Sequence, residues 1–539
     1  MNQPNDNMKS VKSVLAGSAR VLIGAALALL FSTTTRAAVP GITNTGSANS
    51  FNLVATQGYI TQPDGATIYS WGYGCATGSA PSFVPYSTGA FCPPMQVPAP
   101  TLVVTENVPF TVTLTNNLPP AAGNTSLVFP GLNLVSVSGG VAGIRAQEAA
   151  PGGSVTYTLV ATSPGTHGYL SGTQTDLQVE MGLYGAVVVR PASSPAACSS
   201  IGSDIAQRLG TGNPGVDFRL APAAYNHAAA CYDREYLTQW MELDPRIHAA
   251  AEAQVKAIAT CVPTAAAPCA TALDLKTEPY HPAYFLINGR SMPDNMDASY
   301  APNYPNQPYN ANPHMHPGDL TLVRIVGQGH WQHPFHEHGN HVRILGRDGN
   351  LILSQTDAAK LGGRMEFNTD TTPGQAEDGI FYWTGKGLGW DIYGHTPGNP
   401  GNPPCIPDAN GYYTVASGAN VNSPNYYEWC ADHNHPLETN PVGNVGSGGP
   451  ATQFDPLIVT NGLWYNGTPY MGPDAVNRSR GPTPLPPGGA LQNPPGESGI
   501  AFMWHSHNER EITTNDVFPG GMLMMMLVDP PVWYIDETL

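Results

Sequence analysis

The stretch TLVVTENVPFTVTLTNNLP, residues Thr101–Pro119, gives the clearest indication of the fold. It contains two runs rich in β-branched residues, and Glu106 and Asn107 between them are suited to a turn. The segment SVTYTLVAT, Ser154–Thr162, has the same character. Strand-like runs alternate with turn residues from Phe51 to Arg190, so this part of the chain is predicted to be an all-β unit of sandwich or barrel size.

A second β unit is predicted beyond residue 195. Its strand-like runs are REYLTQW (234–240), YFLINGRSMP (284–293), DLTLVRIVG (319–327), HVRILGRDG (341–349), GIFYWTG (379–385) and GMLMMMLV (521–528). We therefore expect two β domains, residues 38–195 and 196–539, with no residues left for a third barrel. The Ala-rich segment Arg246–Thr260 predicts the main helix, a connection without chemistry of its own.

The composition excludes several classes of protein. Charged residues make up only 11% of the 539 positions, whereas 59 positions are Gly and 53 are Pro. Such a chain cannot build long charged helices or coiled coils, and it favours short strands joined by many turns. The formal net charge of −17 would repel phosphate groups, which excludes nucleic acid as a partner.

The beginning of the chain is typical of a secretory signal. Three basic residues precede an apolar run from Val21 to Phe31, and Thr35 and Ala37 occupy small-residue positions suited to cleavage. The run is shorter than the roughly 20 residues that a membrane span needs. Residues 1–37 are therefore predicted to be a signal peptide, and the mature protein to be secreted, periplasmic or extracellular, without a membrane span.

The eight cysteines form an even set, which in an exported chain favours disulfides. Proximity in sequence suggests the pairs Cys75–Cys92, Cys198–Cys231, Cys261–Cys269 and Cys405–Cys430, although eight cysteines allow about 105 connectivities. The last pair would pin a surface insertion at about residues 395–455, which is rich in Gly, Pro and Asn. An alternative for Cys430 is metal binding, because His433 and His435 follow it closely.

The histidines are concentrated in the second half of the chain, where twelve of the sixteen fall between His314 and His507. The densest run is HWQHPFHEHGNH, residues 330–341. Side chains alternate along a strand, so His336 and His338 would share one face of it. His333 and Glu337 would point to the other face.

A second cluster lies in MWHSHNERE, residues 503–511. Here His505 and His507 would share a face and Ser506 would point away from it. If the two strands are neighbours, four imidazoles converge. Imidazole suits several transition metals and copper is the first choice by the Irving–Williams order, so the sequence predicts a copper site.

Other interpretations of these residues remain open. The histidines could be ordinary polar residues on a solvated strand face, although two His-X-His pairs in one domain argue against this. A third pair, His314 and His316, could be a ligand pair or a turn feature. The methionines at 522, 524, 525 and 526 could bind Cu(I) but more often fill a core strand.

These motifs resemble those of the multicopper oxidases. HPFHEHG (333–339) followed by WHSHNERE (504–511) is similar to their paired copper-binding motifs, and MQVPAPTLVVTENVPFTVTLTNNLP (95–119) to their first entry strands. Similar too are PGGSVTYTL, GLYGAVVVRP and TPGQ with GIFYWTG, so the resemblance covers most of the mature chain. It implies tandem cupredoxin-like Greek-key β-barrels. It also implies His333 as a type 1 copper ligand, His336 as a type 2 ligand, and His338, His505 and His507 as type 3 ligands.

The chain departs from the family pattern at specific positions. Ser506 stands where the family has the cysteine of the type 1 copper, and a hydroxyl cannot replace a soft thiolate. Glu511 stands where the family has the second type 1 histidine. In the first domain the four histidine positions are occupied by Val128, Pro130, Leu170 and Gly172. We therefore expect no blue copper and no three-copper centre, but a reduced site at the remaining imidazoles, with Glu337, Glu509 and Glu511 near enough in sequence to support it.

Three functions are compatible with these residues. The first is an exported copper-dependent oxidoreductase acting on a small-molecule or metal-ion substrate. The second is a protein that binds or buffers copper without turnover, and the third is a structural cupredoxin scaffold. Two retained His-X-His pairs favour the first. A homo-oligomer is compatible with each, but it would not restore the missing ligands, because every copy lacks the same histidines.

Overall fold

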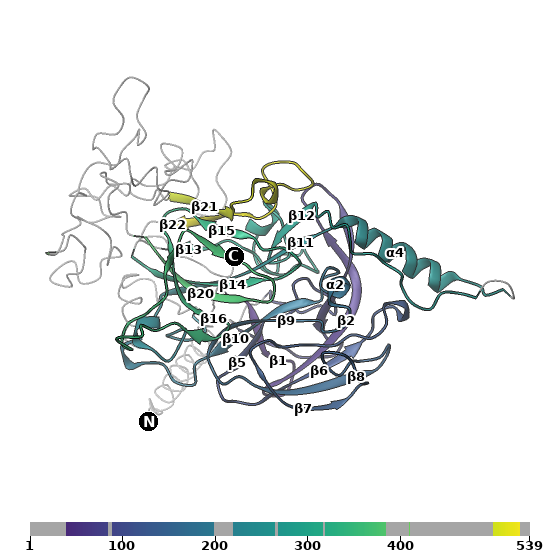
Figure 1. Ribbon diagram of the computed structural model, residues 1–539, viewed down its shortest axis with the longest axis horizontal. Helices are drawn as coiled ribbons and strands as arrows, with labels where there is room; N and C mark the ends of the chain where they lie inside the picture. Colours follow the sequence, from purple (N-terminus) through teal and green to yellow (C-terminus); the bar gives the residue numbers. More distant parts are fainter. Residues whose placement is uncertain are drawn as a thin grey trace, which may run out of the picture. The chain divides into compact units, whose positions relative to one another are not determined.

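The computed structural model describes residues 39–84, 89–198, 219–264, 268–315, 318–383, 409 and 500–528. Within these ranges the strands are arranged in four sheets and helices are few (Figure 1). The all-β prediction is therefore confirmed. The predicted signal peptide, the predicted insertion with Cys405 and Cys430, and His316 lie outside the described residues.

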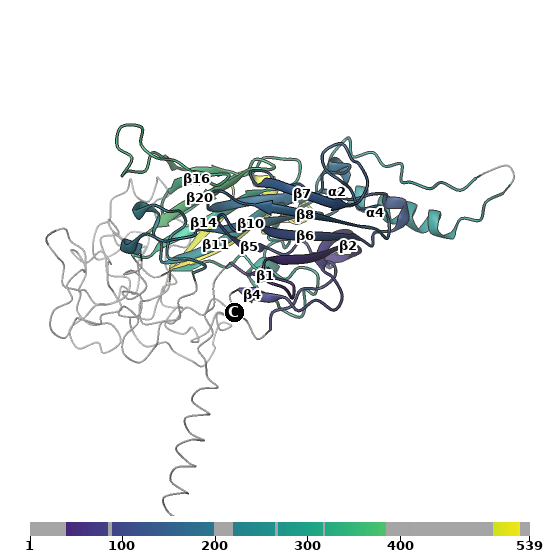
Figure 2. The same cartoon turned by 90° about the horizontal axis from the view of Figure 1, so that it is seen from below.

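The first two sheets have five strands each. One has the order β4-β1-β5-β10-β9, with the bounds Ser82–Val84, Gly41–Asn44, Leu102–Thr105, Tyr184–Arg190 and Gly165–Leu170. The other has the order β3-β2-β6-β8-β7, with the bounds Thr67–Cys75, Ser50–Thr61, Phe110–Asn116, Ser154–Val160 and Asn133–Gly139. Figure 2 shows β6, β8 and β7 side by side, as their pairing requires.

The entry stretch folds as its pattern predicts, into β5 and β6. Asn107 in the turn adopts φ 59°, a left-handed conformation that Asn tolerates better than most residues. Along β6 the inward residues Phe110, Val112 and Leu114 are buried, while the threonines between them are only half buried. The alternation predicted from the sequence therefore packs one face of β6 into the first hydrophobic core.

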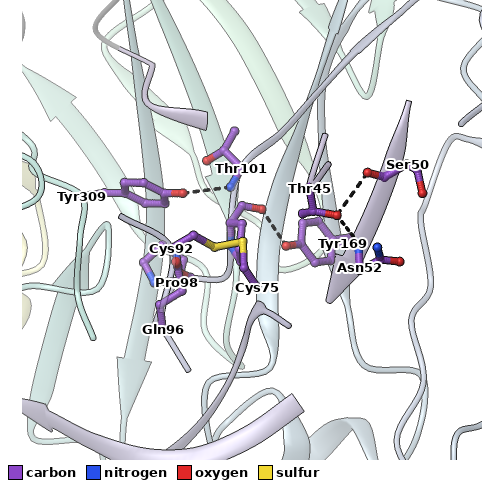
Figure 3. The surroundings of a disulfide bond; sticks show 11 residues. Thr45, Ser50, Asn52, Cys75, Cys92, Gln96, Pro98, Thr101, Tyr169 and Tyr309 are labelled. Atoms are coloured by element: carbon purple, nitrogen blue, oxygen red, sulfur yellow. Dashed lines mark hydrogen bonds between the residues drawn. A yellow bond between two sulfur atoms is a disulfide. The ribbon is translucent and has the colours of Figure 1, made fainter. Parts of the chain in front are cut away.

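The Cys75–Cys92 disulfide ties the end of β3 to the loop that leads into β5 (Figure 3). Beside it, the buried Tyr169 hydroxyl donates a hydrogen bond to the Pro100 carbonyl at 2.7 Å. The Tyr309 hydroxyl, from the second half of the chain, accepts one from the Thr101 N–H at 3.1 Å. The predicted pairs Cys198–Cys231 and Cys261–Cys269 are confirmed as well.

The other two sheets enclose a second core. One follows the order β12-β11-β14-β20-β16-β17, with the bounds Tyr284–Ile287, Arg234–Leu243, Leu320–Gly327, Ala376–Tyr382, Val342–Arg347 and Asn350–Leu351, and β18 (Met365–Glu366) pairs with β16. The other follows β13-β22-β21-β15-β19, with the bounds His314–Met315, Leu523–Val528, Ile500–Ser506, Pro334–Glu337 and Asn368–Asp370. The core between them contains Trp240, Phe335 and Trp504. Met522, Met524 and Met526 are fully buried in it, which confirms the core interpretation for these three methionines, whereas Met525 is half buried.

Helices are short apart from α4, Pro245–Thr260, which confirms the predicted helix at its bounds to within one residue. Asp244 caps its first turn, since its Oδ1 accepts the Arg246 N–H at 3.0 Å. The remaining helical elements of the described part of the chain are α2 (Thr175–Gln178), η1 (Pro120–Ala122), η2 (Ala228–Ala230), η3 (Asp294–Met296) and η5 (Glu509–Ile512). Among the described residues, no helix has the length and apolar character needed to cross a membrane.

Candidate metal centre

The two histidine motifs lie on neighbouring antiparallel strands, β15 and β21. Their register pairs His336 with His505, Phe335 with Ser506 and Glu337 with Trp504. Phe335 and Trp504 are fully buried, with ring centroids 5.9 Å apart. Burial of these aromatic side chains holds the strands in this register, because a slip by one residue would turn every side chain to the opposite face. The register places the imidazoles on the face away from this core.

Four imidazoles meet on that face. The Nε2 atoms of His338 and His505 are 3.1 Å apart, and ring nitrogens of His336, His338 and His505 all lie within 4.8 Å of one another. The His507 ring lies 4.9 Å from that of His336 and 5.8 Å from that of His505, between centroids. Two nitrogens that each bind one ion at about 2 Å cannot be more than about 4 Å apart, so the closest pair already meets the requirement.

Backbone carbonyls orient two of these rings. His336 Nδ1 lies 2.8 Å from the carbonyl oxygen of Phe367, and His505 Nδ1 lies 2.7 Å from that of Ser506. A carbonyl can only accept, so Nδ1 must carry the proton in each case. The tautomer that remains leaves Nε2 with a lone pair, as a metal-binding histidine requires.

The protonation of the rings also suits a metal. Burial lowers the pKa of His336 to about 4, and the neighbouring imidazoles contribute, although the hydrogen bond to Phe367 opposes the shift. Burial likewise lowers the pKa of His505. Both rings are therefore neutral near pH 7 and able to bind a cation. The residues fit a nitrogen-liganded transition metal.

His333 has entirely different surroundings. It is fully buried, its Nδ1 lies 2.8 Å from Glu511 Oε2, and its Nε2 lies 2.9 Å from Glu242 Oε2. Burial alone would lower its pKa, but hydrogen bonds to the two carboxylates outweigh this and raise the pKa to about 9. An imidazolium ring carries a proton on both nitrogens and has no lone pair for a metal. The structure thus sets His333 apart from the other four predicted ligands.

Ser506 and Glu511 complete a buried hydrogen-bonded cluster around His333. The Ser506 hydroxyl donates to Glu511 Oε2, and the Asn508 side-chain amide donates to Glu511 Oε1 at 2.9 Å. The three positions at which the resemblance implies a type 1 copper do come together, as a charge-paired cluster without a thiolate. A type 1 copper does not fit these residues.

Three of the four positions at which the first half lacks the family's histidines lie together, namely Val128, Leu170 and Gly172. Val128 and Leu170 form a two-way backbone bridge, with N···O distances of 2.9 and 3.2 Å. Gly172 lies against them, so close that an added Cβ would approach Val128 Cγ1 to 2.8 Å. None of these side chains can ligate a metal. Close packing of Gly172 against Val128 takes the place of a metal site here.

The three glutamates expected near the site have separate surroundings. Glu337 is buried on the opposite face of β15, accepts the Thr369 hydroxyl at 3.2 Å, and has its pKa raised well above the usual range by burial. Glu509 is exposed. Only Glu511 accepts a hydrogen bond from an imidazole, and that imidazole is His333.

Several residues at the site were not predicted from the sequence. The Phe367 ring, which is 45% exposed, lies 4.2 Å from the ring of His336 and 5.9 Å from that of His507, between centroids. His341 lies 5.6 Å from Phe367 on the same measure. The only local signal for Glu242 is its position between the apolar residues Met241 and Leu243. His314 lies on β13, at the far edge of the sheet from β15.

The family profile described as multicopper oxidase matches residues 94–194. The matched residues include β5, β6, β8, β9 and β10, so the match spans the entry stretch and the positions where the four histidines are replaced.

Solved structures similar to the chain include three copper proteins. The multicopper oxidase mgLAC has 14% identity over 90% of this chain and 87% of its own, with a TM-score of 0.43. The blue copper oxidase from Nitrosomonas europaea has 13% identity over 88% and 85%, with a TM-score of 0.42. The copper nitrite reductase from the same organism has 16% identity over 62% and 84%, with a TM-score of 0.36. No curated protein sequence matches the chain significantly.

Proposed function

We propose that this chain is an exported copper-dependent oxidoreductase, built from two cupredoxin-like barrels at residues 38–195 and 196–539, with one reduced metal site. His336, His338, His505 and His507 would hold the copper. The observation that carries the proposal is the 3.1 Å separation of the His338 and His505 Nε2 atoms, with His336 in the same group. Bound copper supplies one-electron redox chemistry and activation of dioxygen.

The protein's own part in this chemistry is to prepare and shield the site. The carbonyls of Phe367 and Ser506 fix two tautomers in advance, so neither ring needs to change its tautomer when the metal binds. His336 and His338 are buried, whereas His507 is exposed, which leaves one side of the site open to a small-molecule or metal-ion substrate. The His333 cluster links the residue before β15, the end of β21 and η5 to β11 by charge and hydrogen bonds, and we assign it no role in the copper chemistry.

A second function, copper binding or buffering without turnover, has one specific observation in its favour. The buried His333, Glu242 and Glu511 cluster occupies the place at which the resemblance implies a type 1 copper, so the electron entry route that a thiolate-bound copper would offer has no counterpart there. An enzyme would then have to accept its substrate at the four-histidine site itself.

The double variant His336→Ala, His338→Ala tests the metal site. Circular dichroism would establish that it folds, and titration with copper against a competing chelator would measure binding. We expect stable binding to be lost, because the pair on β21 alone is a weak chelate. His281→Ala, which removes an exposed histidine, is the matched control and should bind like the unmodified protein.

A turnover assay distinguishes an oxidoreductase from a protein that only binds or buffers copper. Copper-loaded unmodified protein would be assayed for dioxygen consumption with a phenolic and with a metal-ion reductant. Consumption that disappears in the double variant supports the oxidoreductase. Binding without consumption supports the buffer, and unchanged copper affinity in the double variant would place the metal elsewhere.

A further inference from the structure

The residue opposite His336 on its other neighbouring strand is Asn368. Strand β15 is paired on one side with β21 and on the other with β19, whose register places Asn368 opposite His336 and Thr369 opposite Phe335. Directly opposed residues of antiparallel strands share a face of the sheet. Asn368, His336 and His505 therefore form one row across the sheet, on the face of the four imidazoles.

This face also brings the Asn368 backbone close to the site. The carbonyl of the preceding residue, Phe367, accepts the hydrogen bond from His336 Nδ1 at 2.8 Å. The same contact orients the His336 ring and ties it to the start of β19. A change in the position of β19 would therefore also change the orientation of the His336 ring.

The side-chain oxygen of Asn368 lacks a hydrogen-bond donor among the described residues. Its Oδ1 is buried and accepts no hydrogen bond among the described residues. A buried amide oxygen without a partner is costly, and such groups are few in native proteins. Neighbouring residues on β19 do not share this property, since Thr369 hydrogen-bonds to Glu337 at 3.2 Å on the opposite face.

A cation at the imidazole site would give this oxygen the partner that it lacks. An amide oxygen is a neutral donor with two lone pairs, and side-chain oxygens can join imidazole nitrogens around divalent transition metals. We propose that Asn368 Oδ1 is an additional, oxygen donor to the metal held by His336, His338, His505 and His507. The inference rests on the copper site proposed above and makes it a mixed nitrogen and oxygen site.

The competing explanation is structural, namely that Oδ1 accepts a hydrogen bond from a water unrelated to any metal. The two explanations differ in the sign of a stability change. If Oδ1 awaits a metal, replacing Asn368 by an apolar residue of similar size removes an unpaired group from the metal-free protein. The metal-free melting temperature should then stay the same or rise. If Oδ1 is already paired with water, the same replacement should lower it.

The test compares four proteins: the unmodified chain, Asn368→Leu, Asn368→Asp and the control Thr369→Val. The control changes the next residue of the same strand, on the opposite face. Copper(II) affinity would be measured by chelator competition. Electron paramagnetic resonance of the copper-loaded proteins and melting temperatures without metal would be recorded alongside.

We expect Asn368→Leu to lose about tenfold in copper affinity, as is common when groups around a metal site are removed, and to show an altered copper spectrum. Its metal-free melting temperature should not fall. Asn368→Asp should bind copper at least as tightly as the unmodified protein, because a carboxylate is the stronger donor, and Thr369→Val should bind with unchanged affinity. If Asn368→Leu does not fold, Asn368→Ser, which is smaller and cannot reach as far, should show the same loss and spectral change.

Unchanged affinity and an unchanged spectrum in Asn368→Leu or Asn368→Ser would overturn the inference while leaving the four-histidine site intact. An equal loss in Thr369→Val would also overturn it, because it would show that β19 merely supports the sheet. Failure of the unmodified protein to bind copper would overturn both the inference and the proposed function, and the two failures are therefore distinguishable.

Discussion

Replacing Glu511 by Gln should weaken the fold in a way that depends on pH. Glu511 is one of two buried carboxylates that hold the His333 ring in its charged form. Gln has almost the same shape but no charge. The variant therefore removes the charge–charge attraction and keeps the volume of the side chain, and it also loses the hydrogen bond from the Asn508 amide, a loss that does not depend on pH.

The size of the effect can be worked from the pKa of His333. A rise from 6.5 to about 9 corresponds to about 3.5 kcal/mol of preference for the charged ring, at about 1.4 kcal/mol per pKa unit. The carboxylates of Glu242 and Glu511 share this stabilisation of the charged ring. Losing one of them also leaves part of the buried positive charge of His333 uncompensated. We expect Glu511→Gln to lower the free energy of unfolding by about 1.5 to 3 kcal/mol at pH 6.

The sign of the pH dependence follows from the raised pKa. Stabilisation by a group whose folded pKa is raised is fully present below its unfolded pKa, here 6.5, and is lost as pH rises through about 9. The difference between the unmodified protein and Glu511→Gln should therefore be largest at pH 6 and shrink steadily towards pH 9.5.

Urea unfolding of both proteins at several pH values measures this difference. Glu509→Gln is the matched control, since Glu509 is exposed on the same 3-10 turn and its loss should have little effect at any pH. A difference for Glu511→Gln that stays constant from pH 6 to pH 9.5 would refute the assignment of a charged, carboxylate-paired His333.

Three further predictions follow from the same structure. Copper-loaded protein should be pale, without the intense blue absorption of a thiolate-bound copper, because Ser506 stands at that position; an absorption spectrum checks this, and a strong blue band would contradict it. Copper affinity should fall at acid pH, where protons compete with the metal for the imidazole nitrogens, and His336 should resist protonation until about pH 4; chelator competition between pH 7 and pH 4 measures the fall, and a pH-independent affinity would argue against imidazole ligands. Replacing Cys75 and Cys92 by Ala should lower the free energy of unfolding by about 2 to 4 kcal/mol without loss of copper affinity, as measured by urea unfolding and copper titration. A large loss of affinity would mean that the first two sheets contribute to the site.

The strands and the imidazole face were predictable because both depend on local patterns. The alternation of Phe110, Val112 and Leu114 with threonines identifies β6 directly, and the spacing in His-X-His places each pair on one face. The convergence of His336 and His505 needed only the further assumption that two strands are neighbours, and β15 and β21 confirm it.

The remainder of the site depends on pairing between segments far apart in sequence. Asn368 reaches the row of His336 only through the β15–β19 register, and nothing in the local sequence around it signals a metal. Glu242 reaches His333 from β11, 91 positions earlier in the chain. The sequence therefore identifies His333 as a ligand by motif, whereas its two long-range carboxylate partners explain why it is better described as a buried cation.

The most direct test of the account is a crystal structure of copper-soaked protein with anomalous data collected at the copper edge. We predict one anomalous peak within bonding distance of His338 and His505 and close to His336, and none beside His333 or Ser506. A peak at His333, or no peak at the four imidazoles in protein shown to have bound copper, would contradict the central claim.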